Sequence, residues 1–353
     1  MKLYPNISYI FIIWLVSILI IAFLGFSTIP HSGKFSNDFW QSFRNWDGGH
    51  YLGIAEIGYS RKFQYAFFPL YPLTIKLLSQ ITGNYLVAGV LISIVASFLG
   101  LHLLYKLITD YFERKIAEKA VLAFLFFPTS FYLLTAYSEG LFFFLTIATF
   151  YFLQKRKLFW ATIAAALVSA TRLIGLAVVA ALLIDIGTRE GFNRKNWFIF
   201  LAPLGFIFYC IFLYNQTGDP FYFITAENHW QRTLAIPGVG FWETLKNITS
   251  NGFTNSNFNV LIDLVFAIFG LGFAFRSYRF LPVSLTVYSL ISVIIPLFTP
   301  SLSSMPRFLL PVFPIFILMA LIKNRYLSLL LQLISLMLLG VLTALFVAGY
   351  WVS

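Results

Sequence analysis

Runs of apolar residues long enough to cross a bilayer recur along the whole chain, and they constrain its fold more than any other feature. The runs lie near residues 8–28, 85–108, 120–137, 140–154, 158–171, 173–187, 197–215, 259–275, 280–298, 307–322 and 326–350. Of 353 residues, 59% are apolar and 10% charged, whereas a soluble domain has about a quarter of its residues charged. This composition excludes a soluble nucleic-acid-binding, disordered or disulfide-stapled protein. It predicts an all-α polytopic membrane protein with about eleven transmembrane helices, and nine as the lower count.

The chain is predicted to form one integral membrane domain over residues 1–353. No fixed-length repeat and no low-complexity linker divides it, and Cys210 is its only cysteine. The first run is predicted to be an uncleaved span, because about twenty apolar residues exceed the core of a secretory signal. The sequence His31-Ser32-Gly33 also lacks the small-x-small cleavage pattern.

The positions of the basic residues predict the orientation. The formal net charge is +11, and fifteen of the 24 lysines and arginines fall on one side if the spans alternate and residues 67–82 do not cross. That side is cytoplasmic by the positive-inside rule. Residues 29–84 and 216–258 are then the first and second outer loops, and residues 67–82 form an amphipathic or re-entrant element. The fifteen residues are Lys2, Lys106, Arg114, Lys115, Lys119, Lys155, Arg156, Lys157, Arg189, Arg194, Lys195, Arg276, Arg279, Lys323 and Arg325.

The first outer loop carries the densest group of polar residues. Asp47 precedes two glycines, and ten residues separate Asp47 from Gly58. A helix with Asp47 as its N-cap and Gly58 directly after its end therefore fits this sequence. His50 then lies in the first turn beside Asp47. Glu56 is nine residues on, half a turn out of phase, so the two acids need not share a site. Either Asp47 only caps the helix, or its carboxylate acts as a general base toward an acceptor hydroxyl, with the glycines letting substrate approach.

Four motifs resemble a known family. The string W-D-G-G-H-Y-L-G-I-A-E-I-G-Y at 46–59, followed by A-F-F-P-L-Y-P at 66–72, is similar to the PIG-V-type mannosyltransferases. Y-S-E-G-L-F at 137–142 resembles the Y-[ST]-E-[AS]-L-F segment of that family, with Gly140 as a departure. A-T-R-L-I-G-L at 170–176 and P-R-F at 306–308 resemble its A-T-R-x-x-G-L and P-R-[FY] segments. These matches occur in family order.

The resemblance implies a GT-C-type glycosyltransferase fold with an acidic residue in a long first outer loop. It also implies transfer of a hexose, mannose by family, from a polyprenyl-phosphate donor to a lipid or glycan acceptor at the non-cytoplasmic face. The charge pattern independently places Asp47 on that face. A direct displacement with Asp47 as the base would invert the anomeric centre. The membrane is the plasma membrane in a prokaryote or the endoplasmic reticulum in a eukaryote.

Three further charged residues are candidates for substrate contacts. Arg172 lies between two short apolar runs, where an intramembrane charge is costly and indicates function. It is positioned to bind the donor phosphate, or to pair with an acid such as Glu139. Glu139 lies in a short outer turn. Either it contacts the hydroxyls of the sugar, or it is a solvated turn residue. Arg307 is the first residue of an apolar run, at the outer end of that run. Either it helps to bind the donor phosphate, or its side chain extends to the membrane interface as basic side chains ordinarily do.

No cofactor is expected. The sequence has no D-x-D pair in an outer loop, no H-E-x-x-H and no glycine-rich phosphate loop, so a metal is unsupported, and a lipid-linked donor needs no nucleotide domain. The expected partners are membrane lipids, the polyprenyl-phosphate sugar and the acceptor, not nucleic acid. Two alternatives remain. A transporter or flippase of lipid-linked sugars would show inverted repeats, and a surface-glycan polymerase or ligase would place its key arginines in a late outer loop, where 216–258 has only Arg232.

Overall fold

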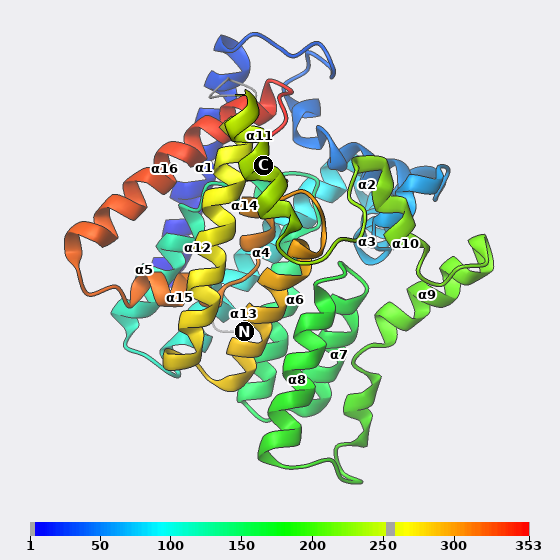
Figure 1. Cartoon of the computed structure of the whole chain (residues 1–353), viewed down its shortest axis with the longest axis vertical. Helices are drawn as coiled ribbons and strands as arrows, with labels where there is room; N and C mark the ends of the chain where they lie inside the picture. Colours follow the sequence, from blue (N-terminus) through cyan, green and yellow to red (C-terminus); the bar gives the residue numbers. More distant parts are fainter. Residues whose placement is uncertain (1–3, 252–257, 353) are drawn as a thin grey trace. The chain divides into compact units, whose positions relative to one another are not determined.

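The computed structural model describes residues 4–251 and 258–352, and these contain helices and no strand. Five helices are long and apolar enough to cross a membrane: α1 (Pro5–Thr28), α4 (Tyr85–Thr109), the stretch Trp197–Thr217 that ends in α9 (Leu204–Thr217), α12 (Phe258–Phe280) and α16 (Arg325–Val347). Shorter apolar helices include α6 (Glu139–Gln154), α7 (Leu158–Ser169) and α13 (Val283–Ile294). Figure 1 labels the main helices along the chain. The prediction of an all-α membrane protein is confirmed.

The predicted spans at 120–137 and 307–322 are not continuous helices. The run at 120–137 contains the end of α5 (Arg114–Leu125) and a short 3₁₀ turn at Ser130–Leu134. The run at 307–322 is divided into α14 (Met305–Leu309) and α15 (Pro314–Ala320). Prolines explain both breaks, because Pro128, Pro311 and Pro314 lack the backbone donor that a continuing helix needs.

The chain forms two compact units. The first comprises Met1–Gly58, Pro69–Lys157 and Phe316–Val352, and the second comprises Tyr59–Phe68 and Leu158–Ile315. In the first unit, α4 packs against α3 (Leu70–Thr82), α5 and α6, while α1 packs against α16. The α6 contact is close because Gly140 faces α4. A Cβ at that position would lie 2.6 Å from the Ser93 carbonyl oxygen.

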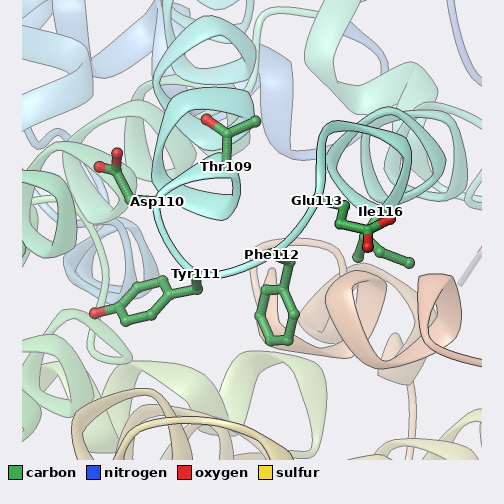
Figure 2. A pocket seen from close by; sticks show the side chains of 6 residues that line it. All are labelled: Thr109, Asp110, Tyr111, Phe112, Glu113 and Ile116. Atoms are coloured by element: carbon green, nitrogen blue, oxygen red, sulfur yellow. The ribbon is translucent and has the colours of Figure 1, made fainter.

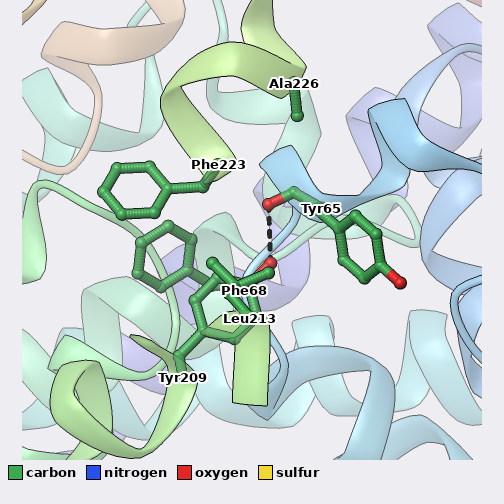
Figure 3. Close-up of a cluster of buried hydrophobic side chains, with 6 residues drawn as sticks. All are labelled: Tyr65, Phe68, Tyr209, Leu213, Phe223 and Ala226. Atoms are coloured by element: carbon green, nitrogen blue, oxygen red, sulfur yellow. Dashed lines mark hydrogen bonds between the residues drawn. The ribbon is translucent and has the colours of Figure 1, made fainter. Parts of the chain in front are cut away.

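In the second unit, α13 packs against α8 (Gly175–Arg189) and α12, and α7 packs against α8 and α9. An aromatic cluster joins the segment 59–68 to α9 and to α10 (Tyr222–Ala226) (Figure 3). The Tyr209 hydroxyl at its centre donates a hydrogen bond of 2.6 Å to the Tyr65 carbonyl. The cluster consists of Tyr65, Phe68, Tyr209, Leu213, Phe223 and Ala226. The unit also contains α11 (Val239–Asn251).

The segments predicted as outer loops are largely helical. The first contains α2 (Asp47–Ile57) and α3, and α3 has 13 residues, about 20 Å of helix, which is shorter than a span. Leu73, Leu77 and Ile81 form one strongly exposed apolar stripe along α3. This stripe is the pattern expected of a helix that faces lipid without crossing the bilayer. Of the predicted second loop, residues 252–257 lie outside the part of the chain that the structure describes.

Candidate functional site

Asp47 is the first residue of α2 and not its cap, so the predicted capping role is wrong. Trp46 occupies the N-cap position with φ 58° and ψ −123°, and no side chain makes a capping hydrogen bond there. Asp47 is half-buried in the first turn, where the helix dipole favours a negative charge. The helix ends as predicted at Gly58, which has φ 81°. The N-cap position therefore belongs to Trp46, and Asp47 follows it as the first helical residue.

Gly48 is required for packing inside the first unit, which corrects the expectation that it opens the backbone to substrate. A Cβ at Gly48 would lie 3.2 Å from Tyr137 Cε2 and 3.4 Å from the Ala136 carbonyl oxygen. Gly49 is exposed, and a Cβ there would contact only the Arg44 carbonyl oxygen, at 3.6 Å. The two adjacent glycines therefore have different roles, and only Gly49 leaves space beside the start of α2.

Replacing Gly48 with alanine is expected to displace Tyr137 and to destabilise the protein by about 1–3 kcal/mol, the usual cost of overpacking. Gly49→Ala is the matched control. Its Cβ has room, and alanine favours a helix over glycine by up to about 1 kcal/mol. Thermal unfolding in one detergent would compare the two variants with the parent. Equal melting temperatures for Gly48→Ala and Gly49→Ala would contradict this assignment.

Two of the four family-like motifs, the first (46–59 with 66–72) and the second (137–142), meet within the first unit. The Tyr137 hydroxyl donates a hydrogen bond of 2.7 Å to the Asn45 carbonyl, directly before the W-D-G-G string. The Tyr51 and Ser138 hydroxyls are 2.9 Å apart. Ser93 Oγ lies 3.0 Å from the Tyr71 hydroxyl and donates to the Tyr137 carbonyl at 2.9 Å. The polar network thus joins segments at 45–51, 71 and 137–138, which the sequence alone did not connect.

The other predicted site residues of the first unit differ in their exposure to solvent. His50, three residues after Asp47, is half-buried, and Tyr51, on the same helical face, is buried. Glu139 begins α6 and is only 1% exposed, so it is not the solvated turn residue that the sequence left open. Glu56 is exposed near the end of α2, half a turn from Asp47. Asp47, His50 and Glu139 therefore belong to the network-bearing part of the first unit, and Glu56 faces away from it.

Arg172 lies in the tight turn between α7 and α8 of the second unit, as the paired short runs predicted. Its carbonyl accepts a hydrogen bond of 2.9 Å from the Gly175 amide, and the Thr171 hydroxyl donates to the Leu167 carbonyl at 3.0 Å. Leu173, the next residue, packs against the aromatic cluster of Figure 3. The turn that carries Arg172 is therefore fixed by backbone hydrogen bonds and by aromatic packing, while its side chain remains half-buried.

Arg307 lies in the short helix α14 and is only 6% exposed, so it is not an ordinary interfacial side chain at the end of a span. Asp263 on α12 accepts a hydrogen bond of 3.0 Å from the Met305 amide. Arg232 donates to the Ser303 carbonyl at 3.3 Å, and its guanidinium lies 4.7 Å from the Phe308 ring centre. Two polar side chains from distant segments therefore hold the P-R-F element in place.

Asp263 was missed at the level of sequence. It is 5% exposed and lies in the apolar run at 259–275. A lone acid in such a run was a usable signal, since a buried charge within the membrane is retained at a cost. His229 in the second predicted outer loop stacks on Phe63 with ring centres 4.2 Å apart, and Trp230 packs edge-on against the same ring.

No group of three or more His, Cys, Asp or Glu side chains that could hold a metal ion occurs among the described residues. An open hollow of about 690 Å³ lies at the turn between α4 and α5, and its lining includes Asp110 and Glu113 (Figure 2). The predicted topology puts this turn on the cytoplasmic side, opposite Asp47. None of the residues that line the hollow is a predicted site residue.

The fold of this chain is similar to that of a solved structure. The structure is similar to the crystal structure of ArnT from Cupriavidus metallidurans bound to undecaprenyl phosphate, with a TM-score of 0.55 and 15% sequence identity. The similarity covers 92% of this chain and 62% of ArnT, so the chain spans less than two thirds of that protein. The Archaeoglobus fulgidus oligosaccharyltransferase tethered to an acceptor peptide is a weaker match, with a TM-score of 0.43, 13% identity and coverage of 96% and 55%.

The family resemblance is confirmed over the first half of the chain. Residues 27–189 match the family described as Mannosyltransferase (PIG-V). The matched segment contains Asp47, His50, Glu56, Glu139 and Arg172, whereas Arg307 lies outside it. No curated protein sequence matches the chain significantly.

Proposed function

We propose that the chain transfers a hexose, mannose by family, from a polyprenyl-phosphate donor to a lipid or glycan acceptor at the non-cytoplasmic face of its membrane. The observation that carries this proposal is the convergence of two family-like motifs, at 46–59 and at 137–142, around α2. That network fixes the backbone on both sides of Asp47 and leaves its carboxylate half-buried. The family match over residues 27–189 supports mannose as the sugar.

The proposed mechanism is a direct displacement. The Asp47 carboxylate accepts the proton of the acceptor hydroxyl as that oxygen attacks the anomeric carbon of the sugar. The bond from the anomeric carbon to the phosphate oxygen breaks, and the polyprenyl phosphate leaves with the bonding electrons. The configuration of the anomeric centre is therefore inverted. Arg172 and Arg307 hold the leaving phosphate, because a guanidinium pairs with phosphate oxygens through two parallel hydrogen bonds.

The remaining predicted residues are proposed as substrate contacts. His50 lies on the Asp47 face of α2 and Glu139 begins the helix that follows Tyr137 and Ser138, so both are placed to contact sugar or acceptor hydroxyls. Glu56 is exposed on the far side of α2, where it can contact only the acceptor. No residue of the chain is assigned to a metal in this mechanism.

The donor class is tested with purified protein in lipid nanodiscs. Labelled polyprenyl-phosphate mannose and labelled GDP-mannose are supplied separately, together with a lipid extract of the source cells as acceptor. Transfer is expected from the lipid-linked donor alone. Transfer from GDP-mannose would contradict the proposal, and movement of the lipid-linked sugar across proteoliposomes without transfer would indicate a flippase instead.

The predicted sidedness has its own test. In a background with Cys210 replaced by serine, single cysteines at the exposed positions Ser36 and Thr233 are expected to react with an impermeant thiol reagent in intact cells. A cysteine at exposed Lys157 should react only after permeabilisation, since it lies in a predicted cytoplasmic loop. The opposite pattern of labelling would overturn the orientation and place Asp47 on the cytoplasmic side.

A further inference from the structure

The backbone at Trp46, immediately before Asp47, has a conformation that a bulky residue rarely adopts. Its φ is 58° with ψ −123°, whereas side chains with a Cβ strongly prefer negative φ. Such a conformation persists only when the surrounding structure imposes it, and it is common at functional sites. What imposes it here is the segment 346–351 at the end of α16.

This segment contacts both residues that precede Asp47. The buried Asn45 side chain donates a hydrogen bond of 3.0 Å from Nδ2 to the Phe346 carbonyl. The Trp46 indole N–H donates to the Tyr350 carbonyl at 3.1 Å. The Trp351 ring lies edge-on to the Trp46 ring, with centres 5.0 Å apart. Two hydrogen bonds and one aromatic contact therefore join positions about 300 residues apart in the chain.

Further contacts tie the segment to the same region. The Ser32 amide donates to the Ala348 carbonyl at 2.9 Å. Phe35 packs edge-on against the Trp46 ring at 5.1 Å, and the Lys34 ammonium lies 5.1 Å from the Trp46 ring centre. The indole is thus enclosed by groups from residues 34–35 and from 350–351, which restrict its rotation.

We infer that Trp46 and the segment 346–351 are positioning elements, which hold the Trp46 turn and so set the position of the Asp47 carboxylate for turnover. The inference rests on the proposed function, because it assumes that Asp47 is the base. Trp46→Phe removes the indole N–H while keeping an aromatic ring, and Trp351→Ala removes the edge contact. Both should release the turn while the helices of the first unit stay packed.

Two measurements test this inference. The first is hydrogen–deuterium exchange of the amides at 46–51, which requires no activity. Trp46→Phe and Trp351→Ala are expected to speed this exchange about tenfold, the factor that one ordinary hydrogen bond or one edge-on aromatic contact is worth. The second is steady-state transfer, in which kcat is expected to fall about tenfold with the donor KM unchanged. A residue that only stabilised the fold would lower the melting temperature without separating kcat from KM.

Trp40→Phe is the matched control. Trp40 is 65% exposed in the preceding 3₁₀ turn and its ring packs against Phe39 and Phe43, so its variant should match the parent in both measurements. Unchanged exchange in Trp46→Phe and Trp351→Ala would overturn the role of the segment. Faster exchange with unchanged kcat would overturn the positioning of Asp47. Absence of transfer by the parent protein, with the exchange pattern as expected, would refute the proposed function alone.

Discussion

Replacing Asp47 with asparagine is expected to lower the transfer rate by about a hundredfold or more while the protein remains folded. A general base typically accelerates a reaction by about 10²–10⁴-fold, and asparagine cannot take up the proton of the acceptor hydroxyl. Stability should change little. Asparagine keeps the size of the side chain and one acceptor oxygen, and the dipole interaction that is lost at the start of α2 is about 0.3–1 kcal/mol. The rate and the melting temperature are measured on the same preparation.

Asp38 provides the control for this variant, because it is the acid in the first outer segment that does cap a turn. Its carboxylate accepts a hydrogen bond of 3.0 Å from the Gln41 amide, and the side chain is exposed. Asp38→Asn keeps that acceptor and is expected to retain full turnover. A folded Asp47→Asn protein with the parent rate would remove Asp47 from the chemistry and leave it as a helix-terminal acid.

The second large effect is expected at Arg172. Arg172→Lys keeps the charge but loses the planar pair of donors that binds phosphate in a bidentate manner. Losing one charge-assisted hydrogen bond, about 1.5–3 kcal/mol, corresponds to a donor affinity that is about ten- to a hundredfold weaker. The fold should persist, because lysine keeps the positive charge and the turn is held by the hydrogen bond from the Gly175 amide and by the packing of Leu173.

Arg189 at the other end of α8 is the control for Arg172. It pairs with Asp185 at 3.1 Å and lies in a predicted cytoplasmic loop, so Arg189→Lys should bind donor as the parent does. Binding is measured with a non-transferable polyprenyl phosphate. Arg307→Lys is expected to weaken the same binding by a smaller factor. Unchanged affinity in Arg172→Lys would exclude Arg172 from the phosphate site.

Hydropathy identified the long helices reliably and identified the broken segments poorly. Apolar runs at 8–28 and 85–108 correspond closely to α1 and α4, since each is long enough to cross the whole hydrocarbon core as one helix. The runs at 120–137 and 307–322 are also strongly apolar but contain prolines, and internal proline interrupts the hydrogen bonds of a helix. If those prolines are counted as helix breakers, the sequence alone predicts that both runs are divided.

The capping prediction for Asp47 failed for a different reason. Asp followed by glycines is a good local signal for a helix start, and α2 does begin at this point. The cap position falls on Trp46 because contacts from residues 346–351 impose its unusual backbone. No local pattern reports a constraint that comes from the opposite end of the chain.

The contacts around the candidate site residues could not be predicted from the sequence. The acid of α2, the acid of α6 and the arginine of the α7–α8 turn were named as candidates from the sequence, and their roles stay predictions. The network through Tyr71, Ser93 and Tyr137 depends on tertiary packing, so no sequence pattern indicates it. The contacts by which Asp263 and Arg232 hold the P-R-F element could likewise not be predicted from the sequence. Asp263 was nevertheless unusual as the lone acid in an apolar run.

The central claim is that Asp47 is the base of the transfer, and a structure with polyprenyl-phosphate mannose bound tests it most directly. The anomeric carbon of the sugar is expected to face the start of α2, and the same structure tests the proposal that Arg172 and Arg307 bind the phosphate. An acceptor hydroxyl placed in line with the leaving oxygen should fall within about 3 Å of the Asp47 carboxylate, the reach of a general base. A donor whose phosphate is bound by other residues, or whose sugar lies out of reach of Asp47, would contradict the account.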